Sequence, residues 1–204
     1  PGLRQRGHQD GPDPIGRRTN DERLDLNRDC LKADSPEMRS VLEKIWKVWD
    51  PHLVLDLHTT NGTEHAYHLT YAPPLHPNTH PAIDALLRDE WLPTVTAQIK
   101  ARDGEDIYYY GNISRDTDVE PQWTTFDHRP RFNNNYAGLR NRVGILSEAY
   151  AYASFEERVR STLHFVEETL DFAHDRAGTI ASLVDQIDAE SIVGTRLATR
   201  AVPQ

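Results

Sequence analysis

The chain has 204 residues, a formal net charge of −9 and a pI near 5.5, so it lacks the basic stripe that binds nucleic-acid phosphates or anionic membranes. No apolar run approaches the roughly 20 residues that a bilayer crossing needs. Cys30 is the single cysteine, which excludes an internal disulfide and a cysteine-built metal site. We therefore expect a small molecule or a peptide as partner, with no nucleic acid and no transmembrane segment.

The N-terminal stretch PGLRQRGHQDGPDPIGRRTNDE (residues 1–22) is rich in Gly, Pro and charge without a period, which is typical of a long surface loop. Hydrophobic residues make up 37% of the chain and the mean hydropathy is −0.70, which is lean for a closed α/β core. Together these features indicate a chain that lacks an N-terminal part.

The first half of the chain predicts one helix and one strand after a short extended segment at 23–29. Ser35 and Pro36 have the side chains of an N-cap and a first helical residue. The helix predicted over 35–49 has one apolar face, formed by Met38, Val41, Leu42, Ile45, Trp46 and Trp49. The run LVLDL (53–57) then predicts a strand, and its continuous hydrophobicity is typical of a strand covered on both faces.

The second half continues the alternation. A Pro- and His-rich loop is expected over 67–81, followed by helical spacing over 81–102, where Pro93 argues against a single unbroken helix. DIYYYG (106–111) predicts a strand, and a long loop is expected from there to Asn135. RVGILSEAYAY (142–152) is a second apolar strand. The helix predicted over 154–177 should turn one set of side chains inward: Phe155, Val159, Leu163, Val166, Leu170 and Ala173.

Both apolar strands end on an ionisable residue. His58 follows the first, in LVLDLHTTNG, and Glu148 ends the second. Because ligands bind at the carboxyl ends of strands in α/β sheets, these two residues are candidates for one site. Taken singly, each is more simply explained as a solvated residue at a strand end.

The segment GRRTNDERLDLNRD (16–29) favours a functional role for His58 and Glu148. It resembles the Gly-Arg, Asn-rich spacer and Asp-Leu-Asn-Arg-Asn/Asp segment of zinc carboxypeptidases of the carboxypeptidase A-like (M14) family. The strand ending in His58 resembles the one that carries this family's third zinc ligand, and RNRVGILSEAY resembles the strand of its catalytic glutamate. The three matches occur in the family's order and span residues 16–170.

The resemblance implies a role for each matched residue. Arg18 would polarise the scissile carbonyl, Asn27 and Arg28 would hold the substrate's terminal carboxylate, His58 would bind zinc, and Glu148 would act as general base. The residue types suit this chemistry, because a guanidinium forks onto carboxylates, imidazole is a good zinc ligand, and a carboxylate can take a proton from zinc-bound water.

The resemblance also implies a three-layer α/β fold, with a mixed, mostly parallel sheet covered by helices on both faces and incomplete at its N-terminus. Residues 1–177 would then form a partial catalytic domain, and 178–204 a C-terminal extension or the start of a following segment.

Other interpretations remain for several residues. Arg18 follows Arg17 and both can be solvated charge, while Asn27 and Arg28 can cap a turn. Tyr136 and Arg140 are candidate substrate contacts, although a loop leading into the strand explains them equally well. Asp56 can orient the His58 ring or satisfy loop amides.

The sequence departs from the family at the zinc site. The family's other two zinc ligands come from a His-x-x-Glu motif before the arginine segment, and none occurs there. One such motif, His164 to Glu167, lies on the last predicted helix, and we interpret it as ordinary helix surface. His65 and His68 are weaker candidates for a ligand. Either an N-terminal part that carries the motif is missing, or the protein no longer binds catalytic zinc.

The sequence thus predicts a zinc-dependent metallocarboxypeptidase that hydrolyses C-terminal peptide bonds. A zinc amidohydrolase of the aspartoacylase and succinylglutamate desuccinylase type is one alternative, and a catalytically silent peptide-binding module is another. The sequence does not indicate which substrate side chain is preferred, because the residues expected to line the pocket lie in the loop from Asn112 to Asn135, which matches no motif. Oligomeric state and compartment are open too, although many members of the family are exported.

Overall fold

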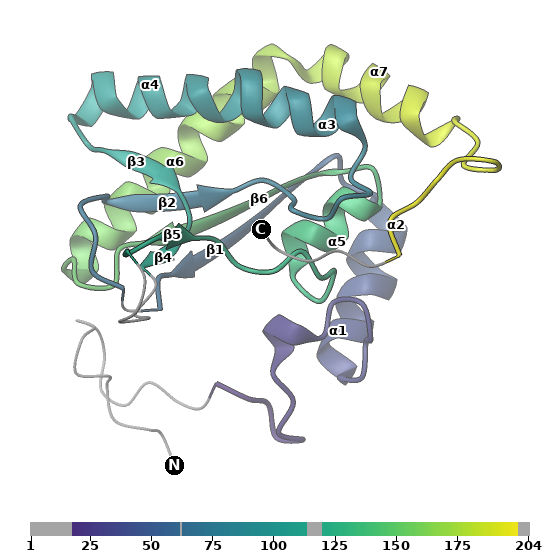
Figure 1. Ribbon diagram of the computed structural model, residues 1–204, viewed down its shortest axis with the longest axis horizontal. Helices are drawn as coiled ribbons and strands as arrows, with labels where there is room; N and C mark the ends of the chain where they lie inside the picture. The colour runs from purple at the N-terminus through teal and green to yellow at the C-terminus, as the bar shows by residue number, and fades with distance from the viewer. Residues whose placement is uncertain (1–17, 62, 114–119, 200–204) are drawn as a thin grey trace.

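A mixed four-stranded sheet with the strand order β1-β6-β2-β3 organises the protein in this computed structural model, which describes residues 18–61, 63–113 and 120–199 (Figure 1). The strands are β1 (Leu53–Thr59), β6 (Val143–Ala149), β2 (Leu69–Ala72) and β3 (Ile107–Tyr109). β1 runs parallel to β6 and β2 parallel to β3, whereas β2 and β6 are antiparallel. The predicted α/β class is confirmed.

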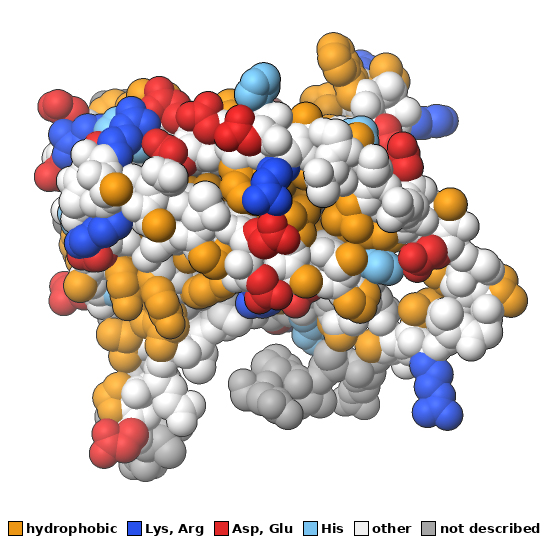
Figure 2. Space-filling model, turned by 90° about the horizontal axis from the view of Figure 1, so that it is seen from above, with side chains coloured by type: hydrophobic (Ala, Val, Ile, Leu, Met, Phe, Trp, Pro, Cys, Tyr) orange, Lys and Arg blue, Asp and Glu red, His pale blue; other side chains and the backbone are white. Residues whose placement is uncertain are grey.

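The helices lie on both faces of this sheet. Figure 1 shows α3, α4 and α7 above the sheet, and α5 below it near α2. Their bounds are α1 (Pro36–Val41), α2 (Lys47–Trp49), α3 (Pro81–Ala85), α4 (Leu92–Asp103), α5 (Asn133–Leu139), α6 (Phe155–Asp175) and α7 (Ala177–Asp188). Among the described residues, none of these helices combines the length and the hydropathy that a membrane crossing requires. On the face seen in Figure 2, acidic and basic side chains are interspersed with apolar ones.

The pleat of β6 separates two packing zones. Val143 and Ile145 are fully buried in the main core, together with side chains of β2, α3, α4, α6 and α7. The side-chain position of Gly144 faces the opposite side of the sheet, where a Cβ atom would come within 2.6 Å of the Asn134 carbonyl oxygen. This glycine therefore lets α5 pack directly on the strand.

Pro93 does not interrupt the helical path. The chain stays helical from α3 to α4, with a π-helical segment (Leu86–Trp91) immediately before the proline. A π-helical segment rearranges the hydrogen bonds that a proline would otherwise break, so the stretch is not one regular α-helix, although its helical path is continuous. The helix buries Leu87, Trp91 and Ile99.

The helix predicted over 35–49 forms, but little of its apolar face is covered. Ser35 accepts a hydrogen bond from the Met38 amide, as expected of an N-cap. A π-helical segment (Leu42–Trp46) links α1 to α2, and Asp50 ends the helix with a φ of +41°. Trp46 is buried, whereas Trp49 is 78% exposed.

The predicted inward face of α6 is wrong. Phe155, Val159, Leu163 and Leu170 are each about half exposed. The buried stripe is instead Arg158, Ser161, Phe165, Thr169 and Phe172. The reason is aromatic packing, because Phe165 stacks on Tyr71 and Phe172 on Trp91, with ring centroids 6.0 and 4.7 Å apart.

Some elements were missed. The Pro- and His-rich stretch contains the buried strand β2, and the long loop before Asn135 contains the start of α5 and a hairpin of β4 (Asn112–Ile113) and β5 (Trp123–Thr124). The short α7 packs Ile180, Val184 and Ile187 into the core. Of the loop predicted at the N-terminus, residues 1–17 lie outside the described residues.

Candidate functional site

The parallel pairing of β1 and β6 brings their carboxyl ends together. His58 is the register partner of Glu148, and Asp56 is the partner of Leu146. Because register partners point to the same face of a sheet, and side chains alternate along each strand, Asp56, His58 and Glu148 share one face. This is the face on which α5 packs against Gly144.

A pocket of about 270 Å³ opens at this edge of the sheet. Five residues predicted from the sequence line it: Arg18, Asn27, Arg28, His58 and Glu148. They come from three separate segments of the chain. The other lining residues are Asp56, Thr59, Thr60, Asn61, Tyr110, Asn112, Phe126, Phe132, Asn134 and Leu146.

Glu148 is the most perturbed acid in the pocket. Its side chain is nearly buried, and its Oε2 atom has no hydrogen-bond partner among the described residues. Burial raises the pKa of Glu148 to about 7, with a further upward contribution from Asp56, while His58 and Arg18 act in the opposite direction. A carboxylate with a pKa near 7 can take and return a proton at neutral pH.

Asp56 holds the ring of His58. Nε2–H of His58 donates to Asp56 Oδ1 at 2.8 Å, and this hydrogen bond is the main cause that raises the pKa of His58. The sequence left two interpretations of Asp56 open, and this hydrogen bond favours the one in which Asp56 orients the His58 ring. With Nε2 occupied, Nδ1 is the ring nitrogen left for a metal or a substrate, as is usual when a carboxylate orients a histidine.

Asp25 organises the arginine segment. Its Oδ2 atom accepts from Arg18 Nε at 2.9 Å, and its Oδ1 atom accepts from the Asn27 backbone amide at 3.0 Å. Asp25 thereby caps the 3-10 turn η1 (Leu26–Arg28), so one carboxylate positions both Arg18 and the pair Asn27 and Arg28. The sequence reasoning gave Asp25 no role.

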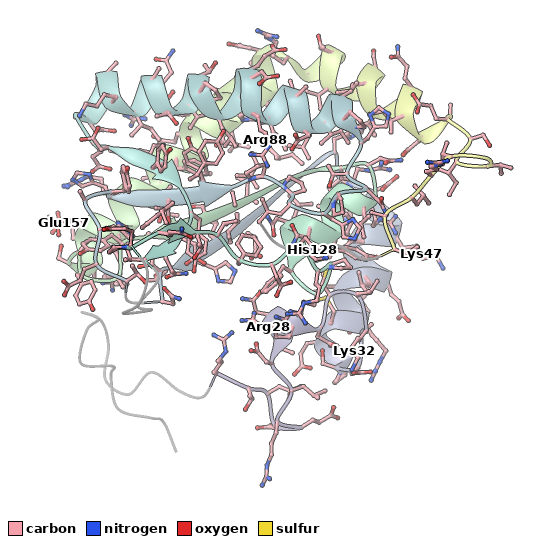
Figure 3. All side chains as sticks on the ribbon, viewed as in Figure 1. Arg28, Lys32, Lys47, Arg88, His128 and Glu157 are labelled. Atoms are coloured by element: carbon pink, nitrogen blue, oxygen red, sulfur yellow. The ribbon has the colours of Figure 1, made fainter. Side chains whose placement is uncertain are left out.

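Arg28 is a cation without a carboxylate partner among the described residues. In Figure 3 it lies below the sheet, on the segment that precedes α1. Its Nη1 donates to the Asn27 carbonyl, and its guanidinium lies 4.6 Å from the Phe132 ring centroid. Burial lowers the pKa of Arg28, as do the charges of Arg131 and Arg18, while Asp25 opposes them. A guanidinium that lines a pocket without a direct ion pair is suited to binding an anion.

Tyr136 and Arg140 do not reach this pocket. They lie with Trp46 and Asp50 in a groove beside α2, where the Trp46 and Tyr136 rings meet edge to face at 5.3 Å. Arg140 lies over Trp46, 5.5 Å from its ring centroid. Their predicted contact with substrate has no support from this arrangement.

The remaining histidine candidates also lie elsewhere. His65 packs on Tyr150, with ring centroids 4.6 Å apart, and His68 accepts from the Asp106 amide. His164 pairs with Asp103 and Glu167 with Arg102, so both side chains link α6 to the end of α4, away from the pocket. In residues 18–61, 63–113 and 120–199, no group of three or more His, Cys, Asp or Glu side chains could hold a metal ion. Cys30 is buried, and burial raises its pKa to about 12, so it is a packing residue.

Four pocket residues come from the region between Asn112 and Asn135, where the sequence offered no pattern: Asn112, Phe126, Phe132 and Asn134. Tyr110 was predicted only as part of a strand. No periodicity or motif marks these positions, because the chain there reaches the pocket through short, irregular elements.

Comparisons with protein-family models, with curated proteins and with solved structures found no match to this chain.

Proposed function

We propose that the chain carries the substrate-binding and proton-transfer residues of a zinc-dependent metallocarboxypeptidase, which hydrolyses the peptide bond next to a free C-terminal carboxylate. The support is one observation: five residues, picked out by the resemblance from three distant segments, line the same pocket. The other two predicted residues, Tyr136 and Arg140, lie outside this pocket in the groove beside α2. We infer likewise that the sheet belongs to the three-layer zinc-carboxypeptidase-like fold.

The described residues do not form a complete zinc site. His58 offers one nitrogen, whereas a catalytic zinc takes three protein ligands as a rule. Two further ligands have to come from outside the described residues, and no step below depends on the metal. Zinc would supply a water whose pKa falls to about 7.

Binding begins at the carboxylate of the substrate. Arg28 has no ion pair with a carboxylate of the described residues, and a guanidinium can donate two parallel hydrogen bonds to a carboxylate. Asn27 lies beside it and adds a neutral donor. This anchor makes the enzyme an exopeptidase, because an internal peptide bond presents no free carboxylate to Arg28.

Proton transfer falls to Glu148. In its ionised form it takes a proton from the attacking water, and it returns that proton to the leaving amine. Arg18 is half exposed and lines the pocket, where its guanidinium can stabilise negative charge that develops on the carbonyl oxygen. Asp25 keeps Arg18 in that place.

A second candidate, a peptide-binding module without catalysis, is favoured by one observation, namely that the described residues lack a three-ligand metal group. Such a module would use Arg28 and Asn27 in the same way. It would have no need of the buried Glu148 carboxylate, whose Oε2 atom finds no hydrogen-bond partner among the residues that the structure describes and whose desolvation is unfavourable. That cost is why we prefer the enzyme.

Kinetics of the longest polypeptide that contains this chain test the proposal. We expect zinc-dependent release of C-terminal residues from peptides, and a drop in kcat of about 10³-fold in Glu148→Gln. Glu43→Gln, on the exposed surface of the helix between α1 and α2, is the matched control and should keep full activity. Unchanged turnover in Glu148→Gln would refute the mechanism.

Two further outcomes separate the alternatives. Faster turnover of N-acyl amino acids than of peptides would assign the site to an amidohydrolase. Binding of peptides that depends on Arg28, without turnover of either substrate, would assign it to the silent module.

A further inference from the structure

A second pocket, of about 240 Å³, lies at the start of α6 and shares no lining residue with the candidate site. Its walls come from the segment between β1 and β2, from the stretch after β6 and from the first turns of α6. Figure 3 shows one of its residues, Glu157, at the left edge of the molecule, well apart from Arg28. The proposed reaction makes no use of this pocket. The lining residues are His65, Ala66, Tyr67, His68, Tyr150, Ala153, Glu157 and Ser161.

Tyr67, Tyr150 and His65 give this pocket an aromatic wall. The ring centroid of His65 lies 4.6 Å from that of Tyr150 and 5.9 Å from that of Tyr67. Trp123 meets the His65 ring edge to face at 5.7 Å and supports it from outside the pocket. Burial lowers the pKa of His65, so its ring is uncharged at neutral pH. The wall therefore consists of neutral aromatic rings.

Glu157 places a fixed negative charge beside this wall. Its Oε2 atom accepts from the backbone amide and the hydroxyl of Ser154, at 2.8 and 2.7 Å, in the capping box that begins α6. These hydrogen bonds lower the pKa of Glu157, and the charges of Arg160 and His68 act in the same direction. The carboxylate is thus ionised at neutral pH. Arg160 itself lies 3.9 Å from Glu105 and does not line the pocket.

We propose that this pocket binds an organic cation, namely an ammonium group that carries alkyl substituents. Aromatic rings attract a cation to their faces, as in the aromatic cages that bind choline and methylated lysine, and the carboxylate adds a charge attraction. A primary ammonium group suits the pocket less, because it is strongly hydrated and has three N–H donors to satisfy, whereas alkyl groups need no acceptor.

The size of the pocket agrees with one small head group. Its volume is below the range of about 300–1,000 Å³ in which pockets enclose drug-sized ligands. The net charge of −9 also favours the approach of a cation over that of an anion.

The binding of three related probes tests the inference. The isotope-labelled chain is titrated with choline, with ethanolamine and with 3,3-dimethyl-1-butanol, which has the shape of choline without its charge. Amide chemical shifts give Kd, and those of residues 65–68 and 150–161 should move. We expect choline to bind at least about fivefold more tightly than either of the other two probes. Equal affinities for choline and the neutral alcohol would overturn the proposal.

Substitutions of Glu157 and Tyr150 assign the binding to this pocket. Glu157→Gln removes the charge and can keep the capping box, which glutamine also forms, so it should weaken choline binding by about two- to fivefold at low salt. Glu156→Gln is the matched control, because Glu156 is exposed on the same turn and does not line the pocket. Tyr150→Leu should abolish the preference for choline over the neutral alcohol, whereas Tyr150→Phe should keep it. Thermal melts show whether each variant is folded, and Tyr67→Leu takes the place of Tyr150→Leu if that variant unfolds.

Two further measurements complete the test. A peptide that carries trimethyl-lysine has the same head group as choline, so the tighter binder of the two distinguishes a protein side chain from a small molecule as the source, and both outcomes support the site. Choline binding that Glu157→Gln and Tyr150→Leu leave unchanged would refute the pocket. Arg28→Gln should have no effect on choline, so the result does not depend on the proposed function.

Discussion

Strands β1 and β6 have the same length, run parallel in register and are both largely apolar, yet their environments differ sharply. β6 is buried at all seven positions, while β1 has no fully buried residue, and Leu57 is 48% exposed. β6 lies between β1 and β2, whereas β1 forms the edge of the sheet. Place in the sheet decides burial here, and hydrophobicity alone does not.

The comparison also concerns function, because the two strands deliver the two central residues of the pocket. The buried strand presents Glu148, whose Oε2 atom has no hydrogen-bond partner in the described part of the chain, and the edge strand presents His58 held by Asp56. The acid thus sits in the better shielded environment. The expectation that β1 is covered on both faces is wrong for the described residues.

The largest expected contrast comes from truncating one apolar side chain on each strand. Ile145→Ala in β6 should lower the free energy of unfolding by about 2–5 kcal/mol, because it leaves a cavity in a fully buried site. Leu57→Ala in β1 should lower it by less than about 1 kcal/mol, since half of that side chain is already in water. Urea denaturation measures both. Equal losses would mean that β1 is covered in solution.

The second prediction concerns the pH dependence of the free energy of unfolding, which should show the buried position of Glu148 at the end of β6. The pKa of Glu148 rises from an ordinary 4.5 to about 7 on folding, so between these pH values the folded state keeps a proton that the unfolded state loses. Stability should therefore fall as pH rises through this window, by on the order of 3 kcal/mol, and then level off.

Glu148→Gln removes this titration, so the variant should gain stability over the wild type above pH 7 and match it near pH 4. Denaturant unfolding of both proteins at a series of pH values measures the difference. A constant difference from pH 4 to 8 would contradict the shifted pKa. His58 titrates in both proteins, and the hydrogen bond to Asp56, which is the main cause of its raised pKa, is kept in the variant. Glu148 adds a smaller upward contribution to the pKa of His58, so the variant should also lower that pKa.

The smallest expected effect tests the cover that α5 gives to β6. Gly144→Ala should destabilise the protein by about 1–3 kcal/mol, because the new methyl group meets the Asn134 backbone. Gly178→Ala in α7 is the matched control, since a Cβ there has no neighbour within 4 Å, and it should stabilise the helix by up to about 1 kcal/mol. Thermal melts measure whether each substitution lowers or raises the melting temperature. A neutral Gly144→Ala would show that α5 can move off the strand.

The sequence predicted those parts of the fold that local patterns determine. Ser35 marks a helix start by its own side chain, and a continuous apolar run marks β1 and β6 as strands. It failed where tertiary contacts choose between alternatives. On α6 the more apolar stripe stays half exposed, because the ring packing of Phe165 and Phe172 selects the other side of the helix.

The candidate site divides in the same way. Arg18, Asn27, Arg28, His58 and Glu148 were found because they belong to spaced motifs. Phe126 and Phe132 belong to none, and ring contacts with Tyr110 and with each other hold them at the pocket. Such positions depend on the path of the chain and leave no period in the sequence.

Asp25 affects which peptide bond of the substrate is placed for cleavage in the pocket. It fixes the distance between the guanidinium groups of Arg18 and Arg28 by bonding to one and capping the turn of the other. In the proposed reaction Arg18 contacts the scissile carbonyl and Arg28 the terminal carboxylate. The distance between them therefore sets how many residues of the substrate lie beyond the cleaved bond, namely one. A single carboxylate, which holds Arg18 and has no contact of its own with the substrate in this scheme, would then decide which peptide bond is cleaved.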